Sequence, residues 1–108
     1  MNFGASRIGA TTAATYIVSG RVTDAKGGRP VPWVDVQDDP GGPAPHHRTL
    51  ASLHGEFELH TVAEPHYLVF TALGYKPARQ KIGRVWYLWM PSGAERIEIR
   101  LEPEGGAE

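Results

Sequence analysis

The sequence predicts an all-β protein, a seven-stranded antiparallel Greek-key β-sandwich. Three observations favour this class. Apolar and polar residues alternate over short stretches, as they do in half-buried strands. Turn-forming residues separate these stretches at intervals of roughly ten residues, a spacing typical of β-sandwiches, and the 108 residues include 13 glycines and 9 prolines. No stretch shows a convincing helical period.

The first strand is expected to begin at Tyr16. Its alternate residues share one face and would line the core: Tyr16, Val18, Gly20 and Val22. Residues 24–28 (DAKGG) are then expected to form a turn. Glycine adopts positive φ angles without steric cost, and the Asp24 carboxylate can cap the turn. The second strand is expected over residues 34–37.

Five further strands are expected on the same pattern. They cover residues 47–52, 56–61, 66–72, 78–82 and 95–101. The chain is therefore expected to hold one β-sandwich over residues 16–103. A flexible N-terminal arm (1–15) precedes this domain, and an acidic tail (104–108) follows it.

Composition limits the possible functions. The formal net charge is −1, so electrostatics give no case for nucleic-acid binding. The chain contains no cysteine, which excludes disulfides and thiolate metal sites.

No apolar run approaches the roughly 18 residues needed to cross a bilayer. Residues 1–15 lack the continuous apolar core of a signal peptide. The compartment stays unknown, with the cytoplasm as the default expectation.

Residues 16–103 resemble the carboxypeptidase regulatory-like domain, a member of the transthyretin-like (prealbumin-like) β-sandwich group. That family's pattern runs roughly G-x-V-x-D-x-x-G-x-P-(V/L)-P-G-A-x-V, then T-D-x-x-G-x-F, then a strand ending G-Y, then a last strand ending x-L-x-P. The matching residues here are Gly20, Val22, Asp24, Gly28, Pro30, Val31, Pro32, Val34, Val36, Gly55, Phe57, Gly74, Tyr75, Leu101 and Pro103. The resemblance implies a prealbumin- or immunoglobulin-like sandwich, which in carboxypeptidases is an accessory to the catalytic domain.

Two positions depart from the family pattern. Trp33 replaces the glycine that usually follows the second proline, and His54 replaces the acidic or Asn residue before the hairpin glycine. The fold expectation survives both changes. We expect Trp33 to be partly exposed near one end of a sheet.

The sequence offers no catalytic motif. The same broad fold includes the 5-hydroxyisourate hydrolases, which share a His, an Arg and a C-terminal Tyr-Arg-Gly-Ser that are missing here, where the chain ends in residues 105–108 (GGAE). No zinc-peptidase H-x-x-E motif occurs either. The sequence therefore predicts a non-enzymatic protein with no catalytic residue and no cofactor.

Four histidines are weak candidates for metal ligands: His46, His47, His60 and His66. His46 and His47 are adjacent and would point to opposite faces of a strand. His60 and His66 flank a short connection and could approach each other near a glutamate. No spacing matches a familiar metal site. The expectation is therefore solvated histidines without a bound metal.

An extra aromatic run, residues 85–91 (VWYLWMP), lies where the family usually has a short polar turn. Strict alternation would place large apolar side chains on both faces of this segment. Two interpretations remain equally open. The outer face is covered by the N-terminal arm or by residues 38–45, or it is a partner-binding patch, because aromatic residues and Met are enriched at interface centres. Contact with a membrane interface is a less favoured third possibility.

The expected function is that of an accessory or protein–protein interaction module that docks on a larger protein or self-associates. The candidate binding residues are Trp86, Tyr87, Trp89 and Met90, with Trp33 as a secondary candidate. The alternative is a carbohydrate- or peptide-binding sandwich that uses the same aromatic residues as stacking platforms. A metal-dependent enzyme built on the histidines is the third class of hypothesis.

Overall fold

The computed structural model describes residues 16–41, 46–83 and 93–105, and within them every regular element is a β-strand. The expected arm (1–15) and the aromatic run (85–91) lie outside the described residues. The seven strands are β1 (Tyr16–Asp24), β2 (Asp35–Asp38), β3 (Arg48–Leu50), β4 (Glu56–Thr61), β5 (His66–Thr71), β6 (Ala78–Ile82) and β7 (Gly93–Leu101). Each corresponds to a strand that the sequence predicts.

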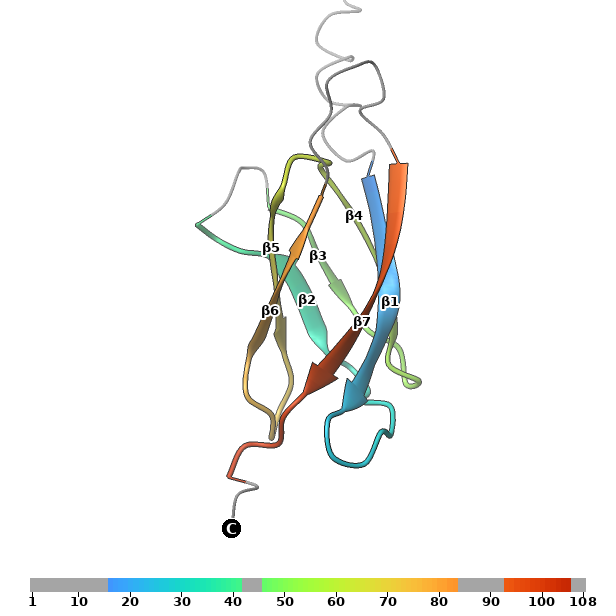
Figure 1. The fold of residues 1–108 in the computed structure, drawn as a ribbon, viewed down its shortest axis with the longest axis vertical. Helices are drawn as coiled ribbons and strands as arrows, with labels where there is room; N and C mark the ends of the chain where they lie inside the picture. The colour runs from blue at the N-terminus through green and yellow to red at the C-terminus, as the bar shows by residue number, and fades with distance from the viewer. Residues whose placement is uncertain (1–15, 42–45, 84–92, 106–108) are drawn as a thin grey trace, which may run out of the picture.

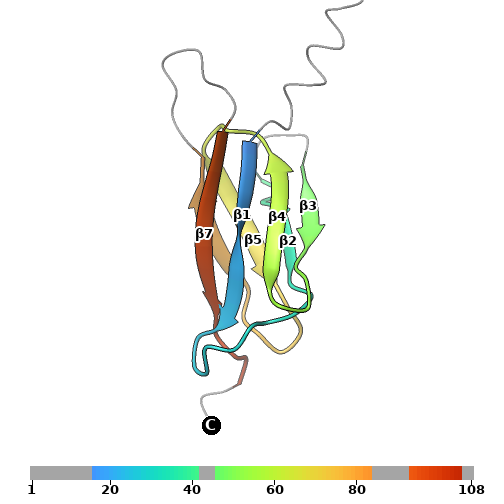
Figure 2. The same cartoon turned by 90° about the vertical axis from the view of Figure 1, so that its right-hand side faces the viewer.

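The strands form two sheets that face each other. The order is β4-β1-β7 in the three-stranded sheet and β3-β2-β5-β6 in the four-stranded sheet. Figure 1 shows the four-stranded sheet beside β1 and β7, and Figure 2 shows β7, β1 and β4 lying over β5 and β2. The described part of the chain is thus an all-β, sandwich-like pair of sheets.

The expectation of purely antiparallel pairing is wrong for one pair of strands. β1 and β7 run parallel, in a register from Tyr16 opposite Gly93 to Asp24 opposite Leu101. A parallel pair needs a long crossover connection, and here the other five strands make that crossover. Hydrophobic alternation does not reveal this direction, because it fixes which side chains face the core and not which way a strand runs.

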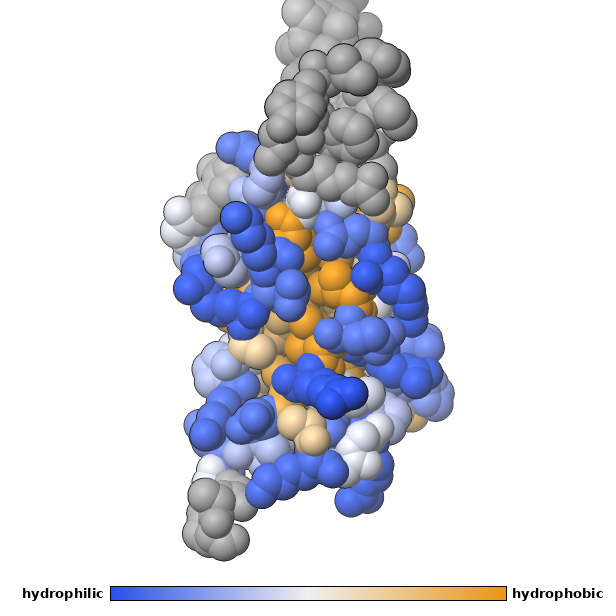
Figure 3. All heavy atoms as spheres, in the orientation of Figure 1, coloured by the Kyte–Doolittle hydropathy of each residue, from blue (hydrophilic) through white to orange (hydrophobic). Residues whose placement is uncertain are grey.

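The space between the sheets is filled by one apolar cluster. Its buried members are Tyr16, Val18, Val22, Val31, Val34, Val36, Ala51, Phe57, Leu59, Leu68, Phe70, Ile82, Ile99 and Leu101. Phe57 and Phe70 meet edge to face across the two sheets, with ring centroids 5.5 Å apart. Figure 3 shows apolar residues along the opening between β6 and β7, so the core is closed less completely on that side.

The turn after β1 forms as the sequence predicts. The Asp24 Oδ1 atom accepts hydrogen bonds from the backbone N–H groups of Lys26 (2.7 Å) and Gly27 (3.1 Å). Its Oδ2 atom accepts a hydrogen bond from the Tyr75 hydroxyl at 2.7 Å. These three hydrogen bonds, led by the one from Tyr75, hold the pKa of Asp24 below its usual range. The turn is thereby joined to the connection between β5 and β6.

The two ends of the sandwich are defined by the two ends of β1. At the Tyr16 end, Tyr16 pairs with Thr61 and with Gly93. At the Asp24 end, the turn after β1 meets the β5–β6 connection through the hydrogen bond between Tyr75 and Asp24. A strand rises roughly 3.3 Å per residue, so the two ends of β1 are roughly 26 Å apart.

Candidate functional site

Trp33 lies at the Asp24 end and is exposed. Its backbone N–H donates to the carbonyl oxygen of Ser52 at 3.3 Å, and 57% of its surface is accessible. Leu53, which follows Ser52 directly, is 59% exposed. The sequence-based expectation of a partly exposed Trp33 near a sheet end is confirmed. Two large apolar residues therefore share one corner of the sandwich.

The backbone of Trp33 is in the left-handed region. Its φ angle is 58°, and it is the one non-glycine residue with a positive φ among the residues that the structure describes. A bulky residue in this region costs on the order of 1–3 kcal/mol. Glycine, which the resembled family usually places here, would adopt this φ freely. The chain thus places an exposed indole on a residue whose backbone is strained.

The main candidate binding residues lie outside the described residues. They are Trp86, Tyr87, Trp89 and Met90. The described residues that flank this run are Gly83 and Gly93. Gly93 pairs with Tyr16, and Gly83 follows Ile82, which pairs with His66. Both flanking residues therefore lie at the Tyr16 end, on the opposite side of the domain from Trp33.

The four candidate histidines occupy different environments. His46 is exposed, and His60 lies on the outer face of β4, where it contacts Glu58 at 2.8 Å. His66 lies inside and is 5% exposed. The expected approach of His60 to His66 is therefore wrong, because the two side chains point to opposite faces. Instead, His66 shares a partner with His47, which precedes β3.

That shared partner is Asp38, at the end of β2. His66 Nε2 lies 2.8 Å from Asp38 Oδ1, and His47 Nδ1 lies 2.8 Å from Asp38 Oδ2. Thr61, from the other sheet, places its hydroxyl 3.0 Å from both carboxylate oxygens. The His47 backbone N–H adds a fourth donor at 2.8 Å. Asp38 is 1% exposed, so this is a buried polar network that joins the two sheets.

Both ring nitrogens of His66 have a buried hydrogen-bond partner. Its Nδ1 atom lies 2.6 Å from the carbonyl oxygen of Glu64, which can only accept. An ionised Asp38 carboxylate also only accepts. Both ring nitrogens of His66 thus lie at hydrogen-bond distance from oxygen atoms, and His66 and Asp38 form a buried hydrogen-bonded pair.

The carboxylate of Asp38 is kept ionised by its donors. Burial acts to raise its pKa, but the hydrogen bonds from the two histidine rings, the His47 backbone and Thr61 together hold the pKa below its ordinary value. Within the described ranges, no group of three or more His, Cys, Asp or Glu side chains has a geometry suited to a metal ion. The network consists of one buried carboxylate and the hydrogen-bond donors that surround it.

Asp38 and Thr61 were missed by the sequence interpretation. Asp38 lies just beyond the strand expected over residues 34–37, and Thr61 is the last residue of the strand expected over residues 56–61. A signal was nevertheless present: Phe57, Leu59 and Thr61 alternate inward, as do His66, Leu68 and Phe70. A polar residue at an inward position must find a buried partner, and two such residues at neighbouring strand ends indicate a shared one.

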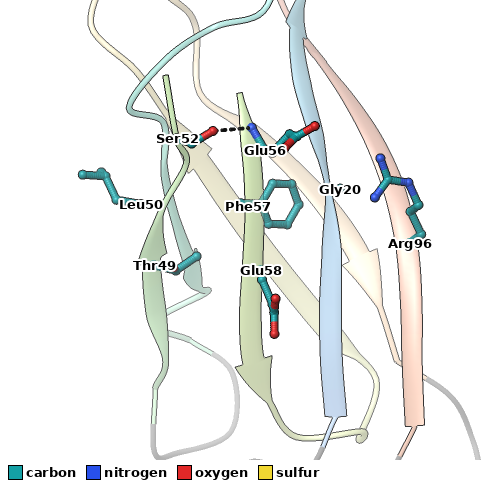
Figure 4. Close-up of a pocket in the computed structure, with 8 residues that line it drawn as sticks. All are labelled: Gly20, Thr49, Leu50, Ser52, Glu56, Phe57, Glu58 and Arg96. Atoms are coloured by element: carbon teal, nitrogen blue, oxygen red, sulfur yellow. Dashed lines mark hydrogen bonds between the residues drawn. The ribbon is translucent and has the colours of Figure 1, made fainter. Parts of the chain in front are cut away.

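A shallow groove of about 480 Å³ crosses β3, β4, β1 and β7. Its lining residues are Gly20, Thr49, Leu50, Ser52, Glu56, Phe57, Glu58 and Arg96. Figure 4 shows Phe57 beside Gly20, with Arg96 on the opposite side. A Cβ atom on Gly20 would lie 3.2 Å from the ring of Phe57. The lining therefore combines an aromatic edge with charged groups of both signs.

The charged groups of the groove already have partners on the sheet surface. Glu56 lies 3.5 Å from Arg21, and Arg96 lies 3.7 Å from Glu98. Both pairs are more than two-fifths exposed, so they contribute little stability. They are consequently available to reorient toward a bound ligand. Phe57, at 5% exposed, presents little ring face for stacking.

No family model matches the chain. No curated protein sequence matches it either. Solved structures do show a similar fold. A candidate carbohydrate-binding protein from Bacteroides uniformis matches with a TM-score of 0.55 and 16% identity, over 83% of this chain and 42% of that one. A catechol 1,2-dioxygenase from Acinetobacter radioresistens, solved as a point mutant, matches with a TM-score of 0.58 and 15% identity, over 92% of this chain and 55% of that one.

These matches support the β-sandwich-like fold and nothing finer. The chain spans about half the length of these structures or less. A further observation concerns membranes: among the described residues, no helix has the length and apolar character that a bilayer crossing requires.

Proposed function

We propose that this chain is a non-enzymatic accessory module of the carboxypeptidase regulatory-like, Greek-key type. It docks on a larger protein or self-associates. The fold, with its two facing sheets, supports this assignment. The observation that carries the functional part is Trp33, because an exposed aromatic residue is retained where its backbone is strained. Strain of this kind persists at sites whose function needs it.

Trp33 has the properties of an interface anchor. Trp is enriched among the residues that dominate binding energy, and Leu53 offers a neighbouring apolar contact that is also more than half exposed. The backbone of this corner is fixed by the hydrogen bond between Trp33 and Ser52. A preorganised backbone loses little conformational entropy on binding. The corner is therefore suited to insertion into a partner's pocket.

Residues 85–91 are proposed as the larger contact on composition alone. Trp86, Tyr87, Trp89 and Met90 are the residues expected to bind, and the described residues that flank this run lie at the end of the domain opposite Trp33. A module with two binding ends can bridge two surfaces of a partner. The two contacts are separable by mutation, since they belong to different segments of the chain.

The test uses two variants and one control. Trp86→Ser with Trp89→Ser removes the larger proposed contact, and Trp33→Ala removes the smaller one. Mass in solution and partner co-purification are measured, with circular dichroism to confirm folding. We expect each variant to weaken association, whereas Leu73→Ser, which removes an apolar side chain that is more exposed than Trp33, has no effect. Unchanged association by folded variants contradicts the proposal.

The second candidate function is carbohydrate or peptide binding. The groove beside Phe57 favours it, because Glu56, Glu58 and Arg96 can hydrogen-bond to hydroxyl or amide groups. The Bacteroides uniformis protein with a similar fold is a candidate carbohydrate-binding protein, which is consistent with this alternative. A glycan array and a peptide library screened against the natural chain distinguish the candidates. Ligand binding by a monomer, lost in Arg96→Ala, favours the groove.

The third candidate, a metal-dependent enzyme built on histidines, needs a bound metal. Elemental analysis of the purified protein tests it directly. The side chains of His47 and His66 are committed to Asp38, so a metal would have to displace existing hydrogen bonds. We therefore rank this candidate last.

A further inference from the structure

We infer that the groove between β3 and β4 binds an extended, basic segment of a partner protein, which adds to the free edge of β4 as an antiparallel strand. The inference rests on peptide binding in the groove, the second candidate function, and names the chemistry of the peptide. It does not depend on Trp33 or on residues 85–91. β4 is the last strand of its sheet, and no strand of the described part pairs with it on the side away from β1.

The groove lies where the two sheets differ in width. The sheet that holds β4 has three strands, and the facing sheet has four. Figure 2 shows β3 to the side of β4, with no strand of the three-stranded sheet in front of it. The place of a further strand beside β4 is thus open among the described strands, and residues of both β3 and β4 line the groove there.

The main-chain groups on the free side of β4 point into this groove. Gly55 accepts a hydrogen bond from the N–H of Val22 at 2.8 Å, and β1 and β4 keep that register along their length. In an antiparallel pair, the backbone groups of alternate residues face the partner strand, so every second residue from Gly55 faces β1. The N–H and C=O groups of Glu56, Glu58 and His60 therefore face the other side.

The turn at one end of the groove confirms this direction. The N–H of Ser52 donates to the carbonyl oxygen of Glu56 at 2.8 Å, and the N–H of Glu56 lies 3.3 Å from the Ser52 hydroxyl oxygen. Beyond this turn, β3 and β4 diverge into different sheets. Within the described ranges, no main-chain hydrogen bond of Glu58 or His60 joins β4 to β3. These two residues offer an added strand the donors and acceptors that it needs.

The charges beside this edge select a basic peptide. Glu56 and Glu58 lie on the outer face of β4, with 58% and 60% of their side-chain area exposed. A residue directly opposite Glu58 in an added strand would direct its side chain to the same face, where opposite charges stabilise a sheet and like charges destabilise it. Glu58 contacts His60 at 2.8 Å, but an exposed pair of this kind contributes little stability. A lysine of the peptide can therefore take that carboxylate.

The inner side of the groove accepts small apolar side chains. Alternate residues of the added strand would point toward the space above β3. Figure 4 shows Thr49 directed from β3 toward β4, whereas Leu50 is directed away. Thr49 is small and half-buried, so a β-branched residue such as valine, which also favours strands, suits this side. The favoured peptide thus alternates basic and β-branched residues, and its amide groups repeat with the same two-residue period as those of β4.

The probe is a short capped peptide that alternates lysine and valine. Its addition to the natural chain should slow the exchange of the Glu58 and His60 amide protons with solvent, as measured by nuclear magnetic resonance. Methylation of the lysine backbone nitrogens should abolish binding, because these N–H groups face β4 when lysine lies opposite Glu58. Methylation of the valine nitrogens, whose N–H groups face away from β4, should weaken binding much less.

Charge reversal tests the side-chain contact. Glu58→Lys should weaken binding of the lysine–valine peptide roughly tenfold and should bind a glutamate–valine peptide better than the natural chain does. Glu102→Lys makes the same change at an exposed position just beyond β7 and should leave the affinity unchanged. Circular dichroism checks that both variants fold, and the methylated peptides test strand addition without any variant. Trp33→Ala should leave peptide binding unchanged, which separates this inference from docking through Trp33.

The possible failures are distinguishable. A peptide that binds equally well after methylation of its lysine nitrogens, and is still lost in Arg96→Ala, would overturn strand addition but keep peptide binding in the groove. A glycan that binds there while the lysine–valine peptide does not would also overturn the inference and keep the groove as a site. Absence of binding by every peptide and glycan would overturn the inference together with the second candidate function.

Discussion

The imidazole ring of His66 and the carboxylate of Asp38 meet at 2.8 Å inside the protein, with 2% and 1% of their side-chain area exposed. The two residues come from adjacent strands of one sheet, and Thr61 binds the same carboxylate from the facing sheet. An ion pair in an apolar interior is costly to form and more costly to break, because removal of one partner leaves an uncompensated charge. This asymmetry leads to the first two predictions.

Replacing Asp38 with Asn should strongly destabilise the protein. The variant keeps the shape of the side chain but removes the negative charge that faces His66 and His47. Breaking a buried pair in this way costs about 3–5 kcal/mol of unfolding free energy. Glu56→Gln is the matched surface control, since Glu56 pairs with Arg21 at an exposed site, and it should cost less than about 1 kcal/mol. Urea unfolding of both variants measures the difference, and equal midpoints would refute the account of the network.

Stability should fall in acid, and Asp38 should contribute to that fall. The pKa of Asp38 is lowered in the folded protein, so the folded state favours the ionised form more than the unfolded state does. Its contribution is therefore fully present above its ordinary pKa of about 3.9 and is lost as the pH drops through the lowered value. Asp38→Asn should flatten the acid limb of the stability curve. A curve of unchanged slope would contradict the assignment.

Gly20→Ala should destabilise the protein although Gly20 lies in the middle of a strand. The added Cβ atom would lie 2.0 Å from the carbonyl oxygen of Ile97, and a backbone atom cannot move aside as a flexible side chain can. We expect a loss of about 1–3 kcal/mol or more. Gly27→Ala is the control, because its Cβ atom would meet only the Arg29 side chain at 3.8 Å. Thermal unfolding of both variants tests the close contact of β1 with β7.

Trp33→Gly should be more stable than Trp33→Ala. Both variants remove the indole, but only glycine relieves the positive φ of 58°. The expected difference is about 1 kcal/mol in favour of glycine, reduced by the greater entropy that glycine gives the unfolded chain. Denaturant unfolding measures it. An alanine variant as stable as the glycine variant would show that the backbone at this position is not strained.

Much of the fold follows from local patterns. The strands over residues 56–61 and 78–82 were predicted with their observed bounds, because alternation and flanking turn residues fix them. The parallel pairing of β1 with β7 could not be predicted, since the inward faces are the same for either direction. The contact between His66 and Asp38 could not be predicted either. The two residues are distant in the sequence and meet only because both side chains point into the core.

The candidate site was predicted less completely. The sequence analysis identified Trp33 as the residue that replaces a glycine of the family pattern, and its exposure is confirmed. Its left-handed backbone follows from the same substitution but becomes evident only in the structure. The residues that line the groove, such as Phe57 and Arg96, carry no motif, because a groove arises from the meeting of several strands rather than from any one segment.

The most direct test of the central claim is site-specific photo-cross-linking at position 33. A photoreactive phenylalanine derivative replaces Trp33 in one variant and Leu73 in the control. Both variants are cross-linked inside the host cell, where the other cellular proteins are present. The interaction account predicts one discrete cross-linked species at position 33 and none at position 73, where the side chain is fully exposed but not strained. A folded position-33 variant that forms no adduct, or the same adducts from both positions, would contradict the proposal that this corner anchors a partner.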